Sequence, residues 1–234
     1  MVSAAARVAL LSGASRGIGA AIAARLAADG WHLSLGLRRP DAVATPPGGS
    51  ATLLHAYDAR VRGSERAWVA ATAERFGRID AVVANAGILI PKSVIAADDD
   101  EIDDIYEVNV KAPMRLVRAA WPWLTATGAG RVINVVSLSG KRVASAQSGL
   151  YATSKFAALA LTHAIRQAGW AEGVRATAIC PGFVATDMAA AAPGRPEELT
   201  QPVDVARVVA FALDLPNTAS VAEIPINWAL EPAL

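Results

Sequence analysis

Residues 8–19 read VALLSGASRGIG, an apolar run followed by Gly13, Gly17 and Gly19 at GxxxGxG spacing. The run predicts a buried strand over 8–11, and the alanine-rich segment 18–29 predicts a helix. A helix amino terminus carries unpaired N–H groups and a positive dipole end, and glycines let the backbone approach a pyrophosphate closely. Glycines that merely permit a tight turn are the alternative. The stretch therefore favours a dinucleotide-binding unit.

The rest of the chain repeats the alternation of strand and helix. Further apolar runs predict strands at 32–37, 52–55, 81–84, 132–136, 175–180 and 221–226. Three-to-four spacing of apolar residues predicts helices at 64–76, 98–127, 151–171 and 203–213. Acidic residues 98–101 fit a helix start, and Pro113 and Pro122 should kink or divide the long helix. This order predicts an α/β, Rossmann-type doubly wound parallel sheet of about seven strands, with helices on both faces.

Length and composition favour one domain spanning residues 1–234, because 234 residues suit one large α/β domain better than two small ones. A net charge of +1 without a basic stripe argues against nucleic acid or a membrane surface as partner. Cys180 is the only cysteine and the three histidines are far apart, so we expect no disulfide and no metal site. No apolar run of about 18 residues predicts a membrane span. A cytoplasmic location fits best.

Cofactor choice is suggested by the end of the second predicted strand, where residues 36–39 read GLRR. An acid there would bind the adenosine ribose and repel a 2′-phosphate. Instead Arg38, with Arg16 of the glycine loop, could hold a phosphate by charge-assisted hydrogen bonds. We therefore expect NADP(H) in preference to NAD(H). If Arg38 and Arg39 are only solvated residues after a strand, the choice stays open.

Tyr151 and Lys155 are four residues apart, so they share one face of the predicted helix. Acid or base work near neutral pH requires the tyrosine pKa to fall by roughly 3 units from ~10. A lysine cation beside the phenol favours that change. Ser137 ends the predicted strand 132–136, and Asn109 lies in the preceding helix.

These pieces occur together in a characteristic order: the glycine loop, Asp58, Asn85-Ala86-Gly87, Asn109, Ser137, Tyr151 with Lys155, and Pro181-Gly182. In this order the chain resembles the short-chain dehydrogenase/reductase family over roughly residues 7–188. Each motif alone is weak, and the joint pattern is highly specific. The usual glycine pair after the last strand is missing.

The resemblance implies which residues touch the cofactor. Asp58 would contact the adenine, the segment from Asn85 would flank the adenine ribose, and the turn from Pro181 would lie beside the nicotinamide carboxamide. The implied cofactor-binding residues are Gly13, Ser15, Arg16, Gly17, Ile18, Gly19, Arg38, Arg39, Asp58, Asn85, Ala86, Gly87, Tyr151, Lys155, Pro181, Gly182, Val184 and Thr186.

The resemblance also implies the catalytic group. Ser137 would hold the substrate oxygen, Tyr151 would exchange its proton, Lys155 would shift the tyrosine pKa and bind the ribose, and Asn109 would anchor a water. Ser139 competes with Ser137, because Ser137 precedes Tyr151 by fourteen residues, one more than is common in the family. Lys141 in the following loop could attract an acidic substrate, as could Arg142 beside it.

The expected function is hydride transfer between NADP(H) and a small alcohol or carbonyl substrate, with 3-hydroxy or 3-oxo acids as a weaker suggestion. A short apolar substrate lid is expected near 182–201, and the family implies a homodimer or homotetramer. A non-catalytic NADPH-binding sensor or scaffold is the alternative, since fold alone does not fix function. A lyase or dehalogenase is less favoured, because the glycine loop and Lys155 are intact.

Overall fold

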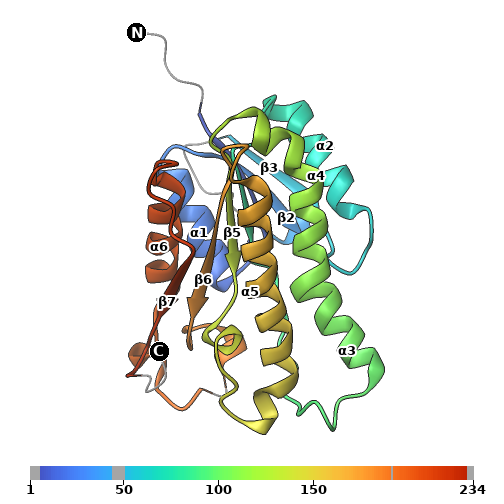
Figure 1. Ribbon diagram of the computed structural model, residues 1–234, viewed down its shortest axis with the longest axis vertical. Coiled ribbons are helices and arrows are strands. Elements are labelled where there is room, and N and C mark those ends of the chain that lie inside the picture. Colours follow the sequence, from blue (N-terminus) through green and yellow to red (C-terminus); the bar gives the residue numbers. More distant parts are fainter. Residues whose placement is uncertain (1–5, 44–50, 191, 231–234) are drawn as a thin grey trace.

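A computed structural model describes residues 6–43, 51–190 and 192–230 of the chain. Seven parallel strands form one sheet in the order β3-β2-β1-β4-β5-β6-β7 (Figure 1). The strands are β1 (Val8–Ser12), β2 (His32–Leu37), β3 (Thr52–Ala56), β4 (Ala81–Ala84), β5 (Arg131–Val135), β6 (Arg175–Pro181) and β7 (Glu223–Ile226). The order reverses between β1 and β4, which is where doubly wound sheets open a crevice for a ligand.

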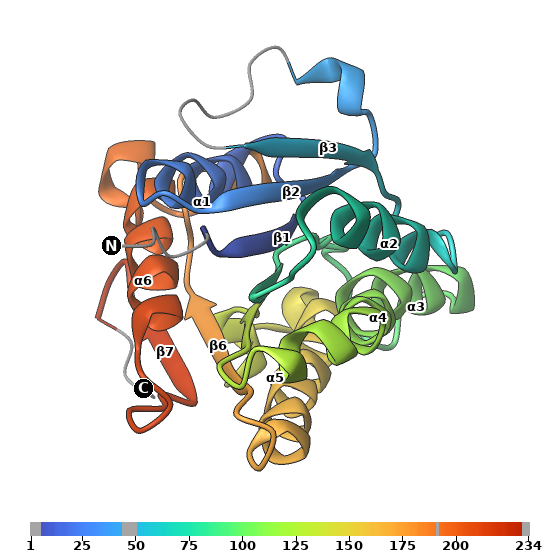
Figure 2. The same cartoon turned by 90° about the horizontal axis from the view of Figure 1, so that it is seen from above.

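Helices cover both faces of this sheet. Figure 2 shows α1 and α6 on one side and α2, α4 and α5 on the other. The helices are α1 (Gly17–Ala28), α2 (Ser64–Phe76), α3 (Asp99–Tyr106), α4 (Ala112–Ala126), α5 (Gly149–Gly169) and α6 (Pro202–Asp214), with a π-helical segment η2 (Glu107–Lys111) and short 3₁₀ turns η1 (Pro40–Ala42), η3 (Leu138–Gly140), η4 (Ala146–Ser148), η5 (Asp187–Ala189) and η6 (Pro196–Glu198). The predicted fold class is confirmed.

The central strands are largely apolar because they face two hydrophobic cores. In β1, Ala9 and Leu11 join the core under α1 and α6, whereas Leu10 joins the core under α2, α4 and α5. In β4, Val82 and Val83 divide in the same way. Side chains alternate across a strand, so a parallel strand covered on both faces needs apolar residues at every position.

The helix predicted over 98–127 is divided at one of the two places expected. It begins with a capping box between Asp98 and Glu101, as the acidic run predicts, and passes into η2 just before Pro113. Pro122 lies inside α4 without breaking it. Because Pro122 is on the exposed face, water can serve the carbonyl that lacks a helical donor.

Two negative observations apply to the part of the chain that the structure describes. Within it, no helix combines the length and hydropathy of a membrane span. Nor do three potential metal-ligating side chains come together there.

Candidate active site

The glycine loop joins β1 to α1 at the carboxyl edge of the sheet. Gly13 and Gly17 adopt φ of +69° and +54°, which side chains other than glycine rarely tolerate. A Cβ atom at Gly19 would lie 2.1 Å from the Gly13 carbonyl oxygen, so this turn requires glycine there. Arg16 is the N-cap residue of α1, and its side chain does not cap the helix. The first N–H groups of α1 therefore fit the phosphates of a dinucleotide.

Asn85, at the end of β4, braces this loop. Its side-chain amide donates to the carbonyl oxygens of Ser12 at 3.1 Å and Gly13 at 3.0 Å. In return, the Ser12 hydroxyl oxygen accepts from the backbone N–H groups of Asn85 and Ala86, both at 3.1 Å. The family resemblance implied only that Asn85 lies beside the ribose; the structure shows that its amide also holds the glycine loop.

Ser137, Tyr151 and Lys155 come together where β5 ends and α5 begins. The Ser137 side chain hydrogen-bonds the Tyr151 phenol. The Lys155 ammonium donates to the Val135 carbonyl oxygen at 3.1 Å and lies 5.6 Å from the centre of the Tyr151 ring. Ser139 meets the same group only through its backbone N–H, which donates to the Ser137 hydroxyl at 3.1 Å. The hydroxyl beside the phenol is therefore that of Ser137.

Burial sets the protonation of this group. It raises the pKa of Tyr151 to about 12, because the phenolate would lose its hydration, and the Ser137 hydrogen bond works in the opposite direction. Burial also lowers the pKa of Lys155 to about 8. The sequence-based expectation of a lowered tyrosine pKa is thus not met by the protein's own groups. At neutral pH the phenol is protonated.

Asn109 lies in the π-helical segment η2 and is 2% exposed. Its amide oxygen accepts from the Ile88 N–H at 2.9 Å, and its amide nitrogen donates to the Ile88 carbonyl and the Ser154 hydroxyl, each at 3.0 Å. Isolated π-helical turns often occur at functional sites. Through its hydrogen bonds, the side chain of Asn109 connects the chain after β4 to Ser154, the residue preceding Lys155 on α5.

The residues expected to select NADP(H) over NAD(H) lie where β1 and β2 end, at the carboxyl edge of the sheet. Arg38 and Arg39 follow β2 and are exposed, and neither makes a hydrogen bond or ion pair within the described chain. Arg16, in contrast, pairs with Asp187 at 2.5 Å. Asp58 follows β3, and its carboxylate accepts from the Arg60 N–H at 3.0 Å.

The turn after β6 leads into the expected lid. The Gly182 N–H donates to the Ile226 carbonyl at 2.9 Å, and a Cβ atom at Gly182 would lie 2.9 Å from the Trp228 ring. Trp228 also meets Phe183 edge to face, with ring centres 5.9 Å apart. Val184 and Thr200 form an isolated parallel β-bridge, which closes the segment between them into a loop. The 3₁₀ turns η5 and η6 lie in this loop. The same Cβ position at Gly182 is 3.2 Å from a Leu138 methyl carbon, so the aromatic pair lies near the residue that follows Ser137.

Lys141, which was expected to attract an acidic substrate, is already paired with a carboxylate of the protein. Its ammonium donates to Glu223 at 2.5 Å, and the same carboxylate contacts His163 at 2.7 Å. The Glu223 carboxylate raises the pKa of Lys141, and Lys141 lowers that of Glu223. Lys141 therefore links the turn after Ser137 to β7.

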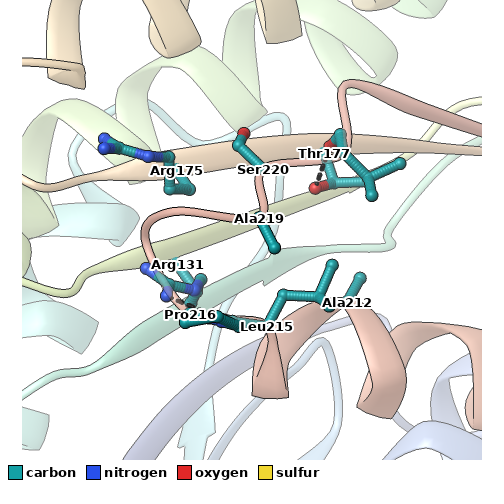
Figure 3. Close-up of a pocket in the computed structure, with 9 residues that line it drawn as sticks. Arg131, Arg175, Thr177, Ala212, Leu215, Pro216, Ala219 and Ser220 are labelled. Atoms are coloured by element: carbon teal, nitrogen blue, oxygen red, sulfur yellow. Dashed lines mark hydrogen bonds between the residues drawn. The ribbon is translucent and has the colours of Figure 1, made fainter.

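A cavity of about 10 Å³, enough for one water, lies at the opposite edge of the sheet (Figure 3). Beside it, the Arg131 guanidinium is 7% exposed and donates to the carbonyls of Ala129, Gly130 and Leu215 and to the Asn217 side chain. Leu215 is the C-cap residue of α6, where a cation is favourable, whereas Ala129 and Gly130 belong to the turn between α4 and β5. Arg131 thus joins the end of α6 to the turn before β5, away from the site.

Comparison with known proteins identifies the family. The profile described as short chain dehydrogenase matches residues 7–196. The chain belongs to the short-chain dehydrogenase family. Agropine synthesis reductase of Rhizobium rhizogenes is 41% identical to this chain over 218 residues, which are 92% of this chain and 50% of that protein. Acetoacetyl-CoA reductase of Shinella zoogloeoides is 30% identical over 222 residues, 88% of this chain and 90% of that protein.

Solved structures agree with this assignment. An alcohol dehydrogenase from the archaeon Thermococcus sibiricus, complexed with 5-hydroxy-NADP, is 32% identical with a TM-score of 0.84, and the alignment covers 94% of this chain and 95% of that chain. A short chain dehydrogenase from Burkholderia cenocepacia J2315 in complex with NADP is 31% identical with a TM-score of 0.86, covering 95% and 96%. The chain spans about half the length of the agropine reductases it matches. Sequence and structure thus agree on the family.

Proposed function

We propose that this dehydrogenase uses NADP(H) to interconvert a small carbonyl compound and its alcohol, with Ser137, Tyr151 and Lys155 at the reacting oxygen. The observation that carries the proposal is the meeting of these three side chains beside the glycine loop. When bound, the nicotinamide supplies or accepts the hydride. The chain's own residues handle the oxygen and the proton.

The protonated state of Tyr151 suits the role of proton donor in carbonyl reduction. With a pKa of about 12, Tyr151 enters the reaction as a phenol and can donate its proton to the oxygen of the reduced substrate. Ser137 holds that oxygen by a hydrogen bond. The tyrosinate left behind lies near the Lys155 ammonium, which stabilises its negative charge. A proton from solvent then restores the phenol. Asn109 acts by positioning the segment that carries Lys155.

NADP(H) is proposed over NAD(H) because Arg16, Arg38 and Arg39 offer three cations and the end of β2 has no acid. NADP-bound relatives support this preference. The remaining cofactor contacts proposed are those expected from the sequence. Residues 1–234 are proposed to form one NAD(P)-binding domain, with the substrate lid near 182–201. The cytoplasmic location and the homo-oligomeric state stay predictions.

Small and largely apolar carbonyl compounds fit the wall formed by Phe183 and Trp228. A 3-oxo acid or its thioester is the more specific proposal, and the similarity to an acetoacetyl-CoA reductase supports it. No observation on the described residues favours the alternative of a non-catalytic NADPH sensor.

The test is cofactor oxidation with a panel of aldehydes, ketones and 3-oxo acids, measured with NADPH and with NADH. Arg38→Gln should lower kcat/KM for NADPH by roughly 10- to 100-fold, because charge-assisted hydrogen bonds are worth about 1.5–3 kcal/mol. Its effect with NADH should be small. Arg118→Gln, an exposed arginine on α4, is the matched control and should change neither value. NADPH binding without any turnover would favour the sensor instead.

A further inference from the structure

One ion pair crosses from the lid to the glycine loop. Arg16 begins α1, and Asp187 begins η5, 171 residues later in the chain. The Arg16 guanidinium contacts the Asp187 carboxylate at 2.5 Å, and the two side chains are 72% and 76% exposed. The pair is therefore reachable by a ligand from solvent.

Packing places the same lid segment against the start of α1. A Cβ atom at Gly17 would lie 3.1 Å from the Thr186 methyl carbon. Thr186 immediately precedes Asp187, so this contact and the ion pair lie side by side. The Asp187 carboxylate is thus held close to the glycine loop and the start of α1, whose N–H groups suit phosphate.

Among the three arginines proposed for the 2′-phosphate, Arg16 alone has a carboxylate partner within the described residues. Arg38 and Arg39 can turn to a phosphate without giving up an interaction. Arg16 can do so only by leaving Asp187. The Asp187 carboxylate therefore competes for Arg16 with the 2′-phosphate, which is the group that NADP(H) has and NAD(H) lacks.

We propose that Asp187 is a cofactor-specificity residue, whose carboxylate occupies Arg16 and is displaced by the 2′-phosphate of NADP(H). NADH lacks that phosphate and leaves the pair in place. An exposed ion pair is weak, so a dianionic phosphate displaces Asp187, and the carboxylate moderates the NADP(H) preference without abolishing it. The inference rests on the proposed NADP(H) selectivity.

Direct binding tests it, with the dissociation constants of NADPH and NADH measured by cofactor fluorescence. Asp187→Asn keeps the shape of the side chain and removes its charge. It should bind NADPH about two- to fivefold more tightly, the range expected for an exposed pair, and NADH within twofold of the wild type. In an Arg16→Gln background the same change should have less than half that effect on NADPH, because the two residues are coupled.

Asp214→Asn is the matched control. Asp214 pairs with Arg7 at 2.6 Å, and both residues are also exposed. Arg7 lies just before β1 and thus at the opposite edge of the sheet, so this variant should leave both dissociation constants unchanged.

Two results would overturn the inference while leaving the cofactor preference intact. One is unchanged NADPH affinity in Asp187→Asn. The other is equal weakening of NADPH and NADH, which would mean that Asp187 closes over a part common to both cofactors. Equal affinity of the wild type for NADPH and NADH, with no loss in Arg16→Gln, would overturn the proposed preference and the inference together.

Discussion

Replacing Asn109 with alanine should cost stability and activity at once. The side chain makes three hydrogen bonds, two to the Ile88 backbone and one to Ser154, in a site that is 2% exposed. At about 1 kcal/mol each, their loss predicts destabilisation by about 3 kcal/mol. For a chain of this size that corresponds to a fall in Tm of about 6–12 °C. Activity should fall as well, because Ser154 precedes Lys155 on α5.

Asn134→Ala provides a matched control. Asn134 is also buried and donates two hydrogen bonds, to the Ala158 carbonyl and the Thr162 hydroxyl, farther along α5. Thermal unfolding followed by circular dichroism, and kcat/KM measured well below both midpoints, separate the two variants. We expect both to lose stability and only Asn109→Ala to lose more than tenfold in kcat/KM. Equal activity in the two variants would refute a positioning role for Asn109.

Three further variants test other parts of the structure. Lys155→Met should raise stability at pH 7 by about 1–3 kcal/mol, because it removes a buried cation whose pKa is lowered to about 8. That gain should shrink as the pH rises from 8 toward 10.5 and vanish above it, where the lysine is neutral in the unfolded state as well; denaturant titrations at pH 7 and pH 10 measure it. Gly19→Ala should weaken NADPH binding at least tenfold, since about 1.4 kcal/mol of loop strain suffices; a titration with NADPH checks this. Arg131→Met should cost about 1–3 kcal/mol of stability by removing donors from the end of α6 and from the turn before β5, without changing the NADPH dissociation constant.

Each variant also has an outcome that counts against its premise. A gain for Lys155→Met that is the same at pH 7 and pH 10 would show that charge is not its source. Wild-type NADPH affinity in Gly19→Ala would mean that the loop can relax around a side chain. Arg131→Met with wild-type stability would mean that water replaces the guanidinium at these carbonyl groups.

The fold was readable from the sequence because its strands are buried on both faces. Continuous apolar runs such as 8–11 and 81–84 stand out in a chain whose helices show three-to-four spacing, and both became strands. The boundaries of the helices and strands were harder to predict than their order. The run at 221–226 pairs with β6 only from Glu223, and the long helix from 98 was divided at η2, not at Pro122. Apolar pattern predicts what is buried, and hydrogen bonding decides where an element ends.

The site was predictable where its residues are close in sequence, as with Tyr151 and Lys155 on one helical face. Contacts between distant segments were not. Nothing in the sequence pairs Arg16 with Asp187, or Lys141 with Glu223. The direction of the Tyr151 pKa was also missed, because burial outweighs the hydrogen bond that opposes it and only the folded site shows how buried the phenol is.

The most direct test of the central claim is the rate of NADPH-dependent carbonyl reduction by Tyr151→Phe, measured with the NADPH dissociation constant of the same protein. The substitution removes the phenolic hydroxyl that hydrogen-bonds Ser137 and leaves the ring in place. We predict a loss of about 10²–10⁴ in kcat, the usual range for a general acid, with NADPH binding within twofold of the wild type. Retention of activity within tenfold would contradict the assignment of Tyr151 as the proton donor.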